Sequence, residues 1–254
     1  MSERALIEEQ YRTTSNLRAR IALHDRFSTS ALSYPRWIFD GYAFGDRADV
    51  LEVGCGDAMI WRENADRIPV GWRLTLTDLS PGMVDEARAT LGGRADYGVA
   101  DVVELPFADG LYDAVIANHM LFHVDERARA FAEIRRVLRS GGIFVGTAIG
   151  RNHLRELRQL APARDGVWTT AWQRFTIEVA ADELVPFFTC VEIERYPDSL
   201  EVTEVGPLLD FLRSRGDVPE EEIAHARVGV EQAIARDGAF HVTKDTARFS
   251  CRKP

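Results

Sequence analysis

The 254-residue sequence contains little lysine, little cysteine and no long apolar run. Its two lysines are Lys244 and Lys253, and 40 acidic side chains exceed 31 basic ones, for a formal net charge of −9. Clustered lysine and arginine bind nucleic-acid backbones, so this balance argues against a nucleic-acid partner. The three cysteines lie far apart without metal-ligand spacing, which argues against a disulfide framework and a zinc cluster.

No apolar run approaches the roughly 18 residues that a membrane-spanning helix needs, so we expect no membrane association. The N-terminal segment MSERALIEEQ is charged where a signal peptide would be apolar, which predicts a cytoplasmic protein. Hydrophobic residues make up 46% of the chain and charged ones 28%, values typical of a globular protein with a buried core. The length favours one elaborated domain, and we expect a monomer or a homodimer.

Short apolar runs alternate with helical segments from residue 48 onward. The apolar runs are ADVLEVG, RLTLTD, ADYGVA, YDAVIAN and GIFVGTA. This alternation is typical of a parallel β-sheet with helices on both faces, and strands buried on both faces are continuously apolar. The sequence therefore predicts a doubly wound α/β fold with a mostly parallel sheet.

The composition suggests three segments. Residues 1–44 are rich in aromatic side chains and read as one or two helices, residues 45–150 carry the strand–helix alternation, and in residues 151–254 the alternation loosens. The last run, FHVTKDTARFSC, is compatible with a strand hairpin that turns at Lys244 and Asp245.

An apolar strand runs directly into two glycines one residue apart, Gly54 and Gly56. Glycine permits a tight turn and a close approach by a ligand, and in a doubly wound sheet such a turn lies where ligands bind. Met59 stands where the dinucleotide fingerprint G-x-G-x-x-G needs its third glycine, and a phosphate-binding loop would need a lysine. The acidic side chain of Glu52 suits a ligand with positive charge. The glycines could also form a simple strand-to-helix turn.

Acidic residues end the next two strands. Asp78 follows the second glycine by 22 residues, and from a strand tip it could accept hydrogen bonds from both hydroxyls of a ribose. Asp101 could accept an adenine amino proton, with Val102 flanking the ring. Alternatively, Asp78 caps the helix that begins near Ser80 and Pro81, and Asp101 belongs to a turn.

Four segments, LEVGCGDA, LTLTDLSPGMVDEAR, VADVVELPFADGLYDAVIANHMLFHV and LRSGGIFV, resemble in this order a class I S-adenosylmethionine-dependent methyltransferase. The resemblance is to small-molecule enzymes of the ubiquinone/menaquinone and natural-product type, and it is dense over residues 45–150. It implies a seven-stranded Rossmann-like sheet, a helical lid over residues 1–44, and an acceptor-site insertion with sheet-completing strands over residues 151–254. It also implies S-adenosylmethionine as cofactor, S-adenosylhomocysteine as product and no metal.

The resemblance further implies which residues bind the cofactor. They are Glu52, Gly54, Cys55, Gly56, Asp78, Leu79, Met83, Asp101, Val102 and Asn118. Asp78 would hold the ribose diol, Asn118 would contact the aminoacyl end, and Glu52 would face the ammonium group directly or through water. Cys55 could equally be a small packed residue of the turn.

Methyl transfer from a sulfonium is an in-line displacement that needs alignment and exclusion of water, and a base only where the acceptor must lose a proton. His119 and His123 follow the fourth strand in NHMLFHVD, and histidine suits proton transfer at neutral pH, so both are candidate catalytic residues. Either could instead pack structurally, and His123 could cap the next helix. No third ligand accompanies them, so we expect no metal site.

The tetrad Asn118-His119-Met120-Leu121 departs from the N-A/D-P-P-[YF] signature of amino-group methyltransferases, which argues against a DNA or protein-amide acceptor. We expect a small planar or hydrophobic acceptor, methylated on oxygen, nitrogen or carbon. Candidate acceptor-binding residues are Tyr11, Trp37, His153, Trp168 and Trp172. Three other functions stay open: an RNA methyltransferase, a non-catalytic relative that binds the cofactor as a regulator or partner subunit, and, at the level of the fold, a nicotinamide oxidoreductase.

Overall fold

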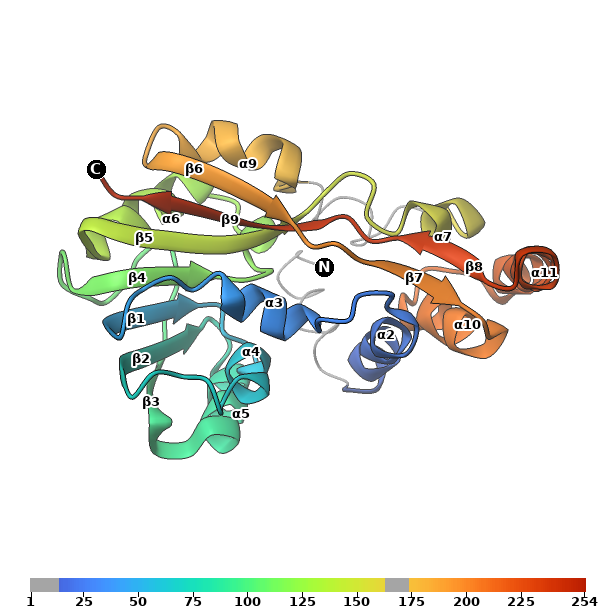
Figure 1. The fold of residues 1–254 in the computed structure, drawn as a ribbon, viewed down its shortest axis with the longest axis horizontal. Helices are drawn as coiled ribbons and strands as arrows, with labels where there is room; N and C mark the ends of the chain where they lie inside the picture. The colour runs from blue at the N-terminus through green and yellow to red at the C-terminus, as the bar shows by residue number, and fades with distance from the viewer. Residues whose placement is uncertain (1–13, 163–173) are drawn as a thin grey trace. The chain divides into compact units, whose positions relative to one another are not determined.

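The computed structural model describes residues 14–162 and 174–254, with side chains from residue 21 onward (Figure 1). The chain forms two compact units, each assembled from separate stretches. The unit that we call the sheet unit comprises Leu32–Gly150, Phe175–Tyr196 and Thr246–Pro254. The other, the helical unit, comprises Met1–Ala31, Arg151–Arg174 and Pro197–Asp245. Each terminal segment expected from the sequence therefore contributes residues to both units.

A seven-stranded sheet forms the centre of the sheet unit, in the order β3-β2-β1-β4-β5-β9-β6 (Figure 1). All its neighbouring strands run parallel except β9, which is antiparallel to β5 and β6. The expected doubly wound, mostly parallel fold is confirmed. The strands are β1 (Arg47–Val53), β2 (Gly71–Asp78), β3 (Ala95–Val99), β4 (Tyr112–Ala117), β5 (Leu138–Ile149), β6 (Thr189–Arg195) and β9 (Thr246–Arg252).

Helices cover both faces of this sheet. One apolar cluster contains Leu51 and Val53 of β1 together with residues of α6 and α9, and a second contains Val50 with residues of α3, α4 and α5. Side chains alternate between the two faces of a strand, so Glu52 points to the same face as Val50. The helices are α3 (Tyr34–Asp40), α4 (Met59–Glu63), α5 (Pro81–Leu91), α6 (Arg127–Val137) and α9 (Ile177–Leu184), with short 3-10 helices η1 (Gly92–Arg94) and η2 (Leu121–His123).

The helical unit packs four described helices with an antiparallel pair of strands. These are α2 (Thr14–Phe27), α7 (Arg155–Leu160), α10 (Val205–Ser214), α11 (Glu220–Asp237), β7 (Ser199–Val202) and β8 (Phe240–Thr243). The expected hairpin that turns at Lys244 and Asp245 is wrong, because β8 pairs with β7 whereas β9 belongs to the seven-stranded sheet. Over the described ranges, no helix is both long enough and apolar enough to span a membrane.

Lys244 forms a buried ion pair with Asp198 inside the helical unit. The same carboxylate accepts hydrogen bonds from the Ser28 hydroxyl (2.7 Å) and the Thr29 backbone N–H (3.0 Å). Burial alone would raise the pKa of Asp198, but the Lys244 ammonium and the Ser28 hydroxyl hold it below its usual range. These contacts tie the end of α2 to the start of β7 and the end of β8.

We expect Lys244→Met to lower the free energy of unfolding by about 3–5 kcal/mol, because it leaves the buried carboxylate without its counter-charge. Urea denaturation measures this loss. The double variant Lys244→Met/Asp198→Asn removes both charges and should recover most of the stability. If Lys244→Met alone unfolds like the wild type, the ion pair contributes nothing to the unit.

Candidate cofactor and active site

The chain leaves β1 through a turn whose backbone conformation favours glycine. Gly54 and Gly56 have φ angles of +69° and +55°, in the left-handed region that L side chains rarely adopt. A Cβ on Gly54 would lie 2.8 Å from the Cβ of Met120, which excludes any side chain there. A Cβ on Gly56 would meet no atom within 4 Å, so the turn leaves open space at this position for a ligand to approach the backbone.

Asp78 fixes this turn from the tip of the neighbouring strand β2. Its Oδ2 accepts the Gly56 backbone N–H at 3.0 Å, and its Oδ1 accepts the Ser80 backbone N–H at 2.9 Å. The structure thus brings together two residues that lie 22 positions apart, and it also gives Asp78 a local role at the start of α5. Each carboxylate oxygen has a further lone pair, so Asp78 retains the capacity to accept bonds from ligand hydroxyls.

Glu52 is a buried carboxylate beside the same turn, with 2% of its surface exposed. It accepts hydrogen bonds from the indole N–H of Trp61 on α4 and, at 3.0 Å, from the side-chain amide of Asn118. The pKa of Glu52 is raised to about 7. Burial and, to a smaller extent, the nearby charge of Asp78 raise it, and the two hydrogen bonds lower it. A cation in this place would stabilise the ionised form of Glu52.

Asn118, directly after β4, has an acceptor atom that lacks a partner. Its Nδ2 donates to Glu52 Oε1 (3.0 Å) and to the Tyr42 hydroxyl (2.8 Å), so both amide protons are used and the orientation of the amide is fixed. Its Oδ1 is buried and has no hydrogen-bond partner among the described residues. An unsatisfied buried acceptor costs about 1–3 kcal/mol, and a ligand ammonium would satisfy it. The aminoacyl end of S-adenosylmethionine carries such an ammonium, so these residues fit that cofactor.

The remaining expected cofactor residues differ in exposure. Leu79 and Asp101 are exposed and Met83 is half-buried, whereas Val102 packs in the apolar cluster with α6. Asp101 also has a turn role, since its Oδ1 accepts the Val103 backbone N–H at 3.2 Å. Their contacts with the cofactor therefore stay predictions.

Cys55, between the two glycines, is buried, and burial raises the pKa of its thiol well above the usual range. A reactive cysteine needs a thiolate at neutral pH, so the thiol environment favours a packed residue. Any contact of Cys55 with the cofactor stays a prediction.

The two histidines expected to be catalytic lie in different surroundings. His119 has a φ of +50°, its backbone N–H donates to Thr147 Oγ1 at 2.9 Å, and its Nε2 is hydrogen-bonded to the Tyr34 hydroxyl. His123 lies in η2, and the centroid of its ring is 4.2 Å from the ring centroid of Phe122. Within the part of the chain that the structure describes, no group of acidic, histidine or cysteine side chains could hold a metal ion.

The expected acceptor-binding residues are only partly visible. Tyr11, Trp168 and Trp172 lie outside the described residues. Trp37 is buried on α3 in the sheet unit, against the rings of Tyr34 and Tyr196. His153 belongs to the helical unit, where its Nδ1 accepts the Asp245 backbone N–H at 3.2 Å. Whether any of them touches an acceptor stays a prediction.

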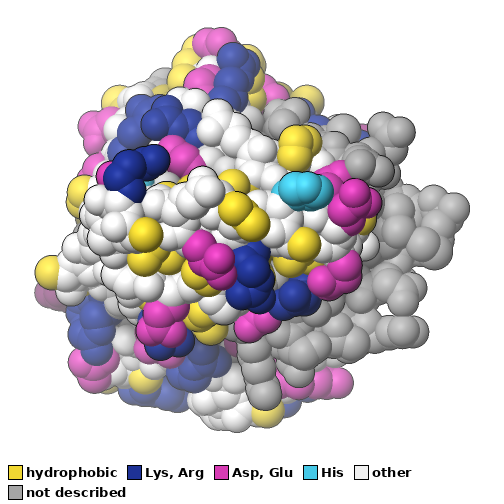
Figure 2. Space-filling model, turned by 90° about the vertical axis from the view of Figure 1, so that its right-hand side faces the viewer, with side chains coloured by type: hydrophobic (Ala, Val, Ile, Leu, Met, Phe, Trp, Pro, Cys, Tyr) yellow, Lys and Arg dark blue, Asp and Glu magenta, His cyan; other side chains and the backbone are white. Residues whose placement is uncertain are grey.

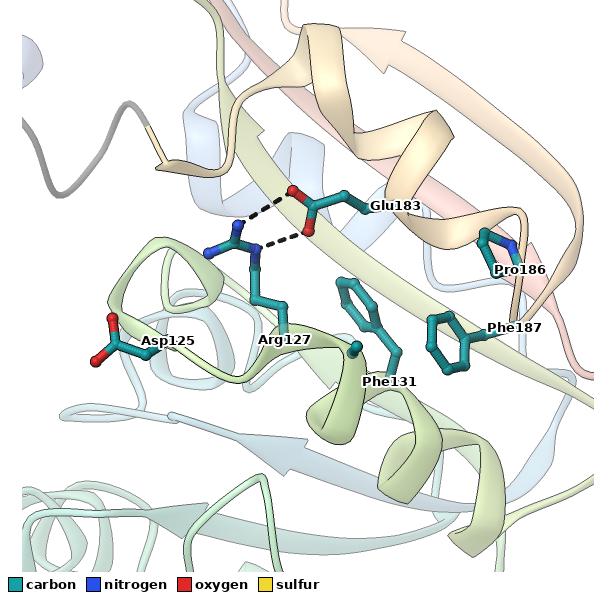
Figure 3. Close-up of a pocket in the computed structure, with 7 residues that line it drawn as sticks. Asp125, Arg127, Phe131, Glu183, Pro186 and Phe187 are labelled. Carbon is teal, nitrogen blue, oxygen red and sulfur yellow. Dashed lines mark hydrogen bonds and ion pairs between the residues drawn. The ribbon is translucent and has the colours of Figure 1, made fainter.

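A separate pocket of about 370 Å³ opens between α6 and α9, and neither glycine of the turn lines it (Figure 3). Phe131 and Phe187 form its apolar wall, while Arg127 and Glu183 form a two-bond ion pair at 2.7 and 3.1 Å (Figure 3). Arg127 also donates to the Val124 carbonyl. The guanidinium and carboxylate thus neutralise each other, and none of the expected site residues lines this pocket.

The seven-stranded sheet and the glycine turn define a Rossmann-like methyltransferase fold. Residues 51–146 match the family model described as a methyltransferase domain. Over these residues, which are less than half of the chain, the sequence is similar to methyltransferase domains. S-adenosylmethionine is the typical cofactor of this family.

Curated relatives match over this same core. A malonyl-[acyl-carrier protein] O-methyltransferase of Geobacter sulfurreducens is 36% identical over 113 residues, which are 44% of this chain and 42% of that protein. A ubiquinone/menaquinone biosynthesis C-methyltransferase of Desulfotalea psychrophila is 36% identical over 94 residues, 36% of this chain and 37% of that protein. The chain thus spans less than half the length of these relatives.

Solved structures share the fold. One is phosphoethanolamine N-methyltransferase 2 of Haemonchus contortus, in complex with S-adenosyl-L-methionine, with a TM-score of 0.60 and 18% sequence identity. The match covers 100% of this chain and 60% of the Haemonchus chain. The [4+2]-cyclase SpnF has a TM-score of 0.54 and 22% identity, covering 82% and 76%. Proteins named for different reactions share this fold, so the reaction has to be argued from the site.

The raised pKa of Glu52 predicts a pH-dependent affinity for S-adenosylhomocysteine, which carries an ammonium but no sulfonium. The ligand ammonium favours the carboxylate, so binding below pH 7 should release a proton. Affinity should rise with pH up to about 7, by at most about tenfold per unit, and level off above it. Calorimetry at pH 6, 7 and 8, in buffers of different ionisation enthalpy, measures both the affinity and the number of protons released on binding.

Glu52→Gln is the matched control, since it keeps the shape without the titration. Its affinity should vary little between pH 6 and 8. Without ligand, this variant should gain stability relative to the wild type as pH rises from 4.5 to 7, because a carboxylate with a raised pKa loses stabilisation over that range. An equal pH dependence of binding in both proteins would contradict the assignment.

Proposed function

We propose that this chain transfers a methyl group from S-adenosylmethionine to a small organic acceptor and releases S-adenosylhomocysteine. The observation that carries the proposal is the buried Oδ1 of Asn118, which has no hydrogen-bond partner among the described residues and lies beside the carboxylate of Glu52. A methionine ammonium provides donor protons for that oxygen and a positive charge for the carboxylate. Few other metabolites carry such an ammonium group on a nucleoside.

Asp78 is the second point of attachment, from the tip of β2. The carboxylate that holds the Gly56 N–H can also accept the ribose hydroxyls, so the turn conformation and nucleoside binding depend on one side chain. When bound, the cofactor supplies a methyl group on a sulfonium, and the protein has to align the acceptor with it and exclude water.

The acceptor is a small molecule, either free or attached to a carrier. Support comes from the curated relatives, whose names include a malonyl-[acyl-carrier protein] O-methyltransferase and a quinone C-methyltransferase. An RNA acceptor is less favoured, because the net charge is −9 and the face in Figure 2 intersperses basic with acidic side chains. We further propose that the acceptor is planar or hydrophobic, as the aromatic residues of the terminal segments suggest.

Incubation with methyl-labelled S-adenosylmethionine and a bacterial extract tests the function. We expect label in the small-molecule fraction, or in a carrier protein from which mild thioester hydrolysis releases it. Label in RNA would support the alternative enzyme. Binding without any transfer would instead support a regulatory role.

We expect Asp78→Ala to weaken S-adenosylhomocysteine binding by about 1–3 kcal/mol, the usual loss of hydrogen bonds to a carboxylate. Calorimetry measures the dissociation constant. Asp85→Ala, at an exposed carboxylate of α5 paired with Arg88, is the matched control and should bind as the wild type does. Thermal unfolding of both variants checks that the turn still folds. An unaltered dissociation constant in Asp78→Ala would refute the ribose assignment.

A further inference from the structure

His119 adopts a strained backbone conformation at the carboxyl end of β4. A φ of +50° is unusual for a residue with a side chain, and such strain persists only where surrounding contacts enforce it. Two contacts do so here: the backbone N–H donates to Thr147 of β5, and the ring Nε2 meets the hydroxyl of Tyr34. The strain therefore serves to hold the imidazole against Tyr34.

The three residues form a hydrogen-bonded chain whose direction can be deduced. Thr147 Oγ1 accepts the His119 N–H and is also bonded to the Tyr34 hydroxyl. The hydrogen bond to Thr147 lowers the pKa of Tyr34, which is the effect of a hydroxyl that donates to the phenol oxygen. Thr147 therefore donates to Tyr34, and Tyr34 donates to Nε2 of His119. Neutral His119 then carries its own proton on Nδ1.

Tyr34 is placed to receive a proton as well as to give one. It is half-buried and lies against the rings of Tyr196, His119 and Trp37, at centroid distances of 5.2, 5.3 and 6.0 Å. Its oxygen accepts from Thr147 and has a second lone pair. Burial raises the pKa of Tyr34 far above its usual range, so a free phenolate is not the base. The phenol can take up a proton only as it passes its own to His119.

This pair lies next to the proposed aminoacyl site. His119 directly follows Asn118, and the Asn118 amide donates to Tyr42, which follows the helix that begins with Tyr34. Arg248, whose charge acts on Tyr34, is already occupied, since it donates to the carbonyls of Trp37 and Ile38 and pairs with Glu194. The local chemistry therefore suits removal of a proton better than binding of an acceptor carboxylate.

We propose that Tyr34 is a catalytic residue that, together with His119, takes the proton from an acceptor hydroxyl or carbon acid. The proposal rests on the proposed methyl transfer and narrows its acceptor class. The acceptor's proton moves to Tyr34 Oη while the phenolic proton moves to His119 Nε2. The freed electron pair of the acceptor forms the bond to the methyl carbon, and the electrons of the broken carbon–sulfur bond remain on sulfur. His119 then returns its extra proton to solvent.

A carboxylate acceptor has no proton to lose at neutral pH. Its methylation would release no proton, whereas a hydroxyl or carbon acid releases one proton per S-adenosylhomocysteine formed. The two acceptor classes are therefore distinguished by proton release alone, which a pH indicator in weak buffer measures during turnover.

The resting state of the pair is tested without any acceptor. In protein labelled with ¹⁵N-histidine and saturated with S-adenosylhomocysteine, we expect His119 to carry its proton on Nδ1 and an unprotonated, hydrogen-bonded Nε2. The spectrum of His119→Gln identifies the resonances. Tyr34→Phe and Thr147→Val should each shift the Nε2 signal. A neutral His119 protonated on Nε2 in the wild type would overturn the proposal.

Turnover with the acceptor labelled in the extract experiment tests the catalytic step. We expect Tyr34→Phe, which keeps the ring, to lower kcat by about 100-fold or more while its S-adenosylhomocysteine affinity stays within about twofold. Tyr97→Phe is the matched control and should keep kcat, because the Tyr97 hydroxyl donates to the Gly92 carbonyl and has no part in the proposed proton transfer. Unchanged kcat in Tyr34→Phe, or no proton release, would overturn the proposal. Failure of the wild type to transfer a methyl group would instead overturn the proposed function. The ¹⁵N-histidine spectrum is recorded without turnover, so it tests the Tyr34–His119 pair independently.

Discussion

A buried carboxylate without a counter-charge is the constraint on which the site depends. Glu52 lies at the end of a central strand, held by neutral donors from Trp61 and Asn118, and no ion pair with it occurs in the described part of the chain. Burial of a charge is costly unless it is compensated, so the folded protein keeps an unfavourable group beside an open glycine turn. A ligand ammonium compensates both Glu52 and the unpaired oxygen of Asn118. Ligand binding therefore also removes the electrostatic cost of the buried carboxylate.

The sequence predicts the parts of the fold that follow from local pattern. Continuous apolar runs predict the parallel strands, and the spacing of Gly56 and Asp78 predicts their meeting, because consecutive parallel strands end at the same edge. It does not predict the path after β8. A turn signal at Lys244 and Asp245 suggests a hairpin, but the signal cannot show that the next strand, β9, pairs with β5, which lies far earlier in the chain.

The residues that complete the site were not predictable from spacing. Trp61, Tyr42 and Tyr34 reach Glu52, Asn118 and His119 only through tertiary packing, and aromatic residues at such positions are more often simple core. A weak signal was available for Asn118 and His119, since polar residues directly after an apolar strand mark the ligand-binding edge. Their hydrogen-bond partners, which determine what each can do, required the structure.

A crystal structure of the complex with S-adenosylhomocysteine would show whether Asn118 and Glu52 bind the ligand ammonium. We predict that the ammonium lies within about 3 Å of Asn118 Oδ1, on the side of the amide away from Tyr42. An ammonium bound elsewhere, with Asn118 Oδ1 still unpaired or satisfied by another protein group, would contradict this prediction.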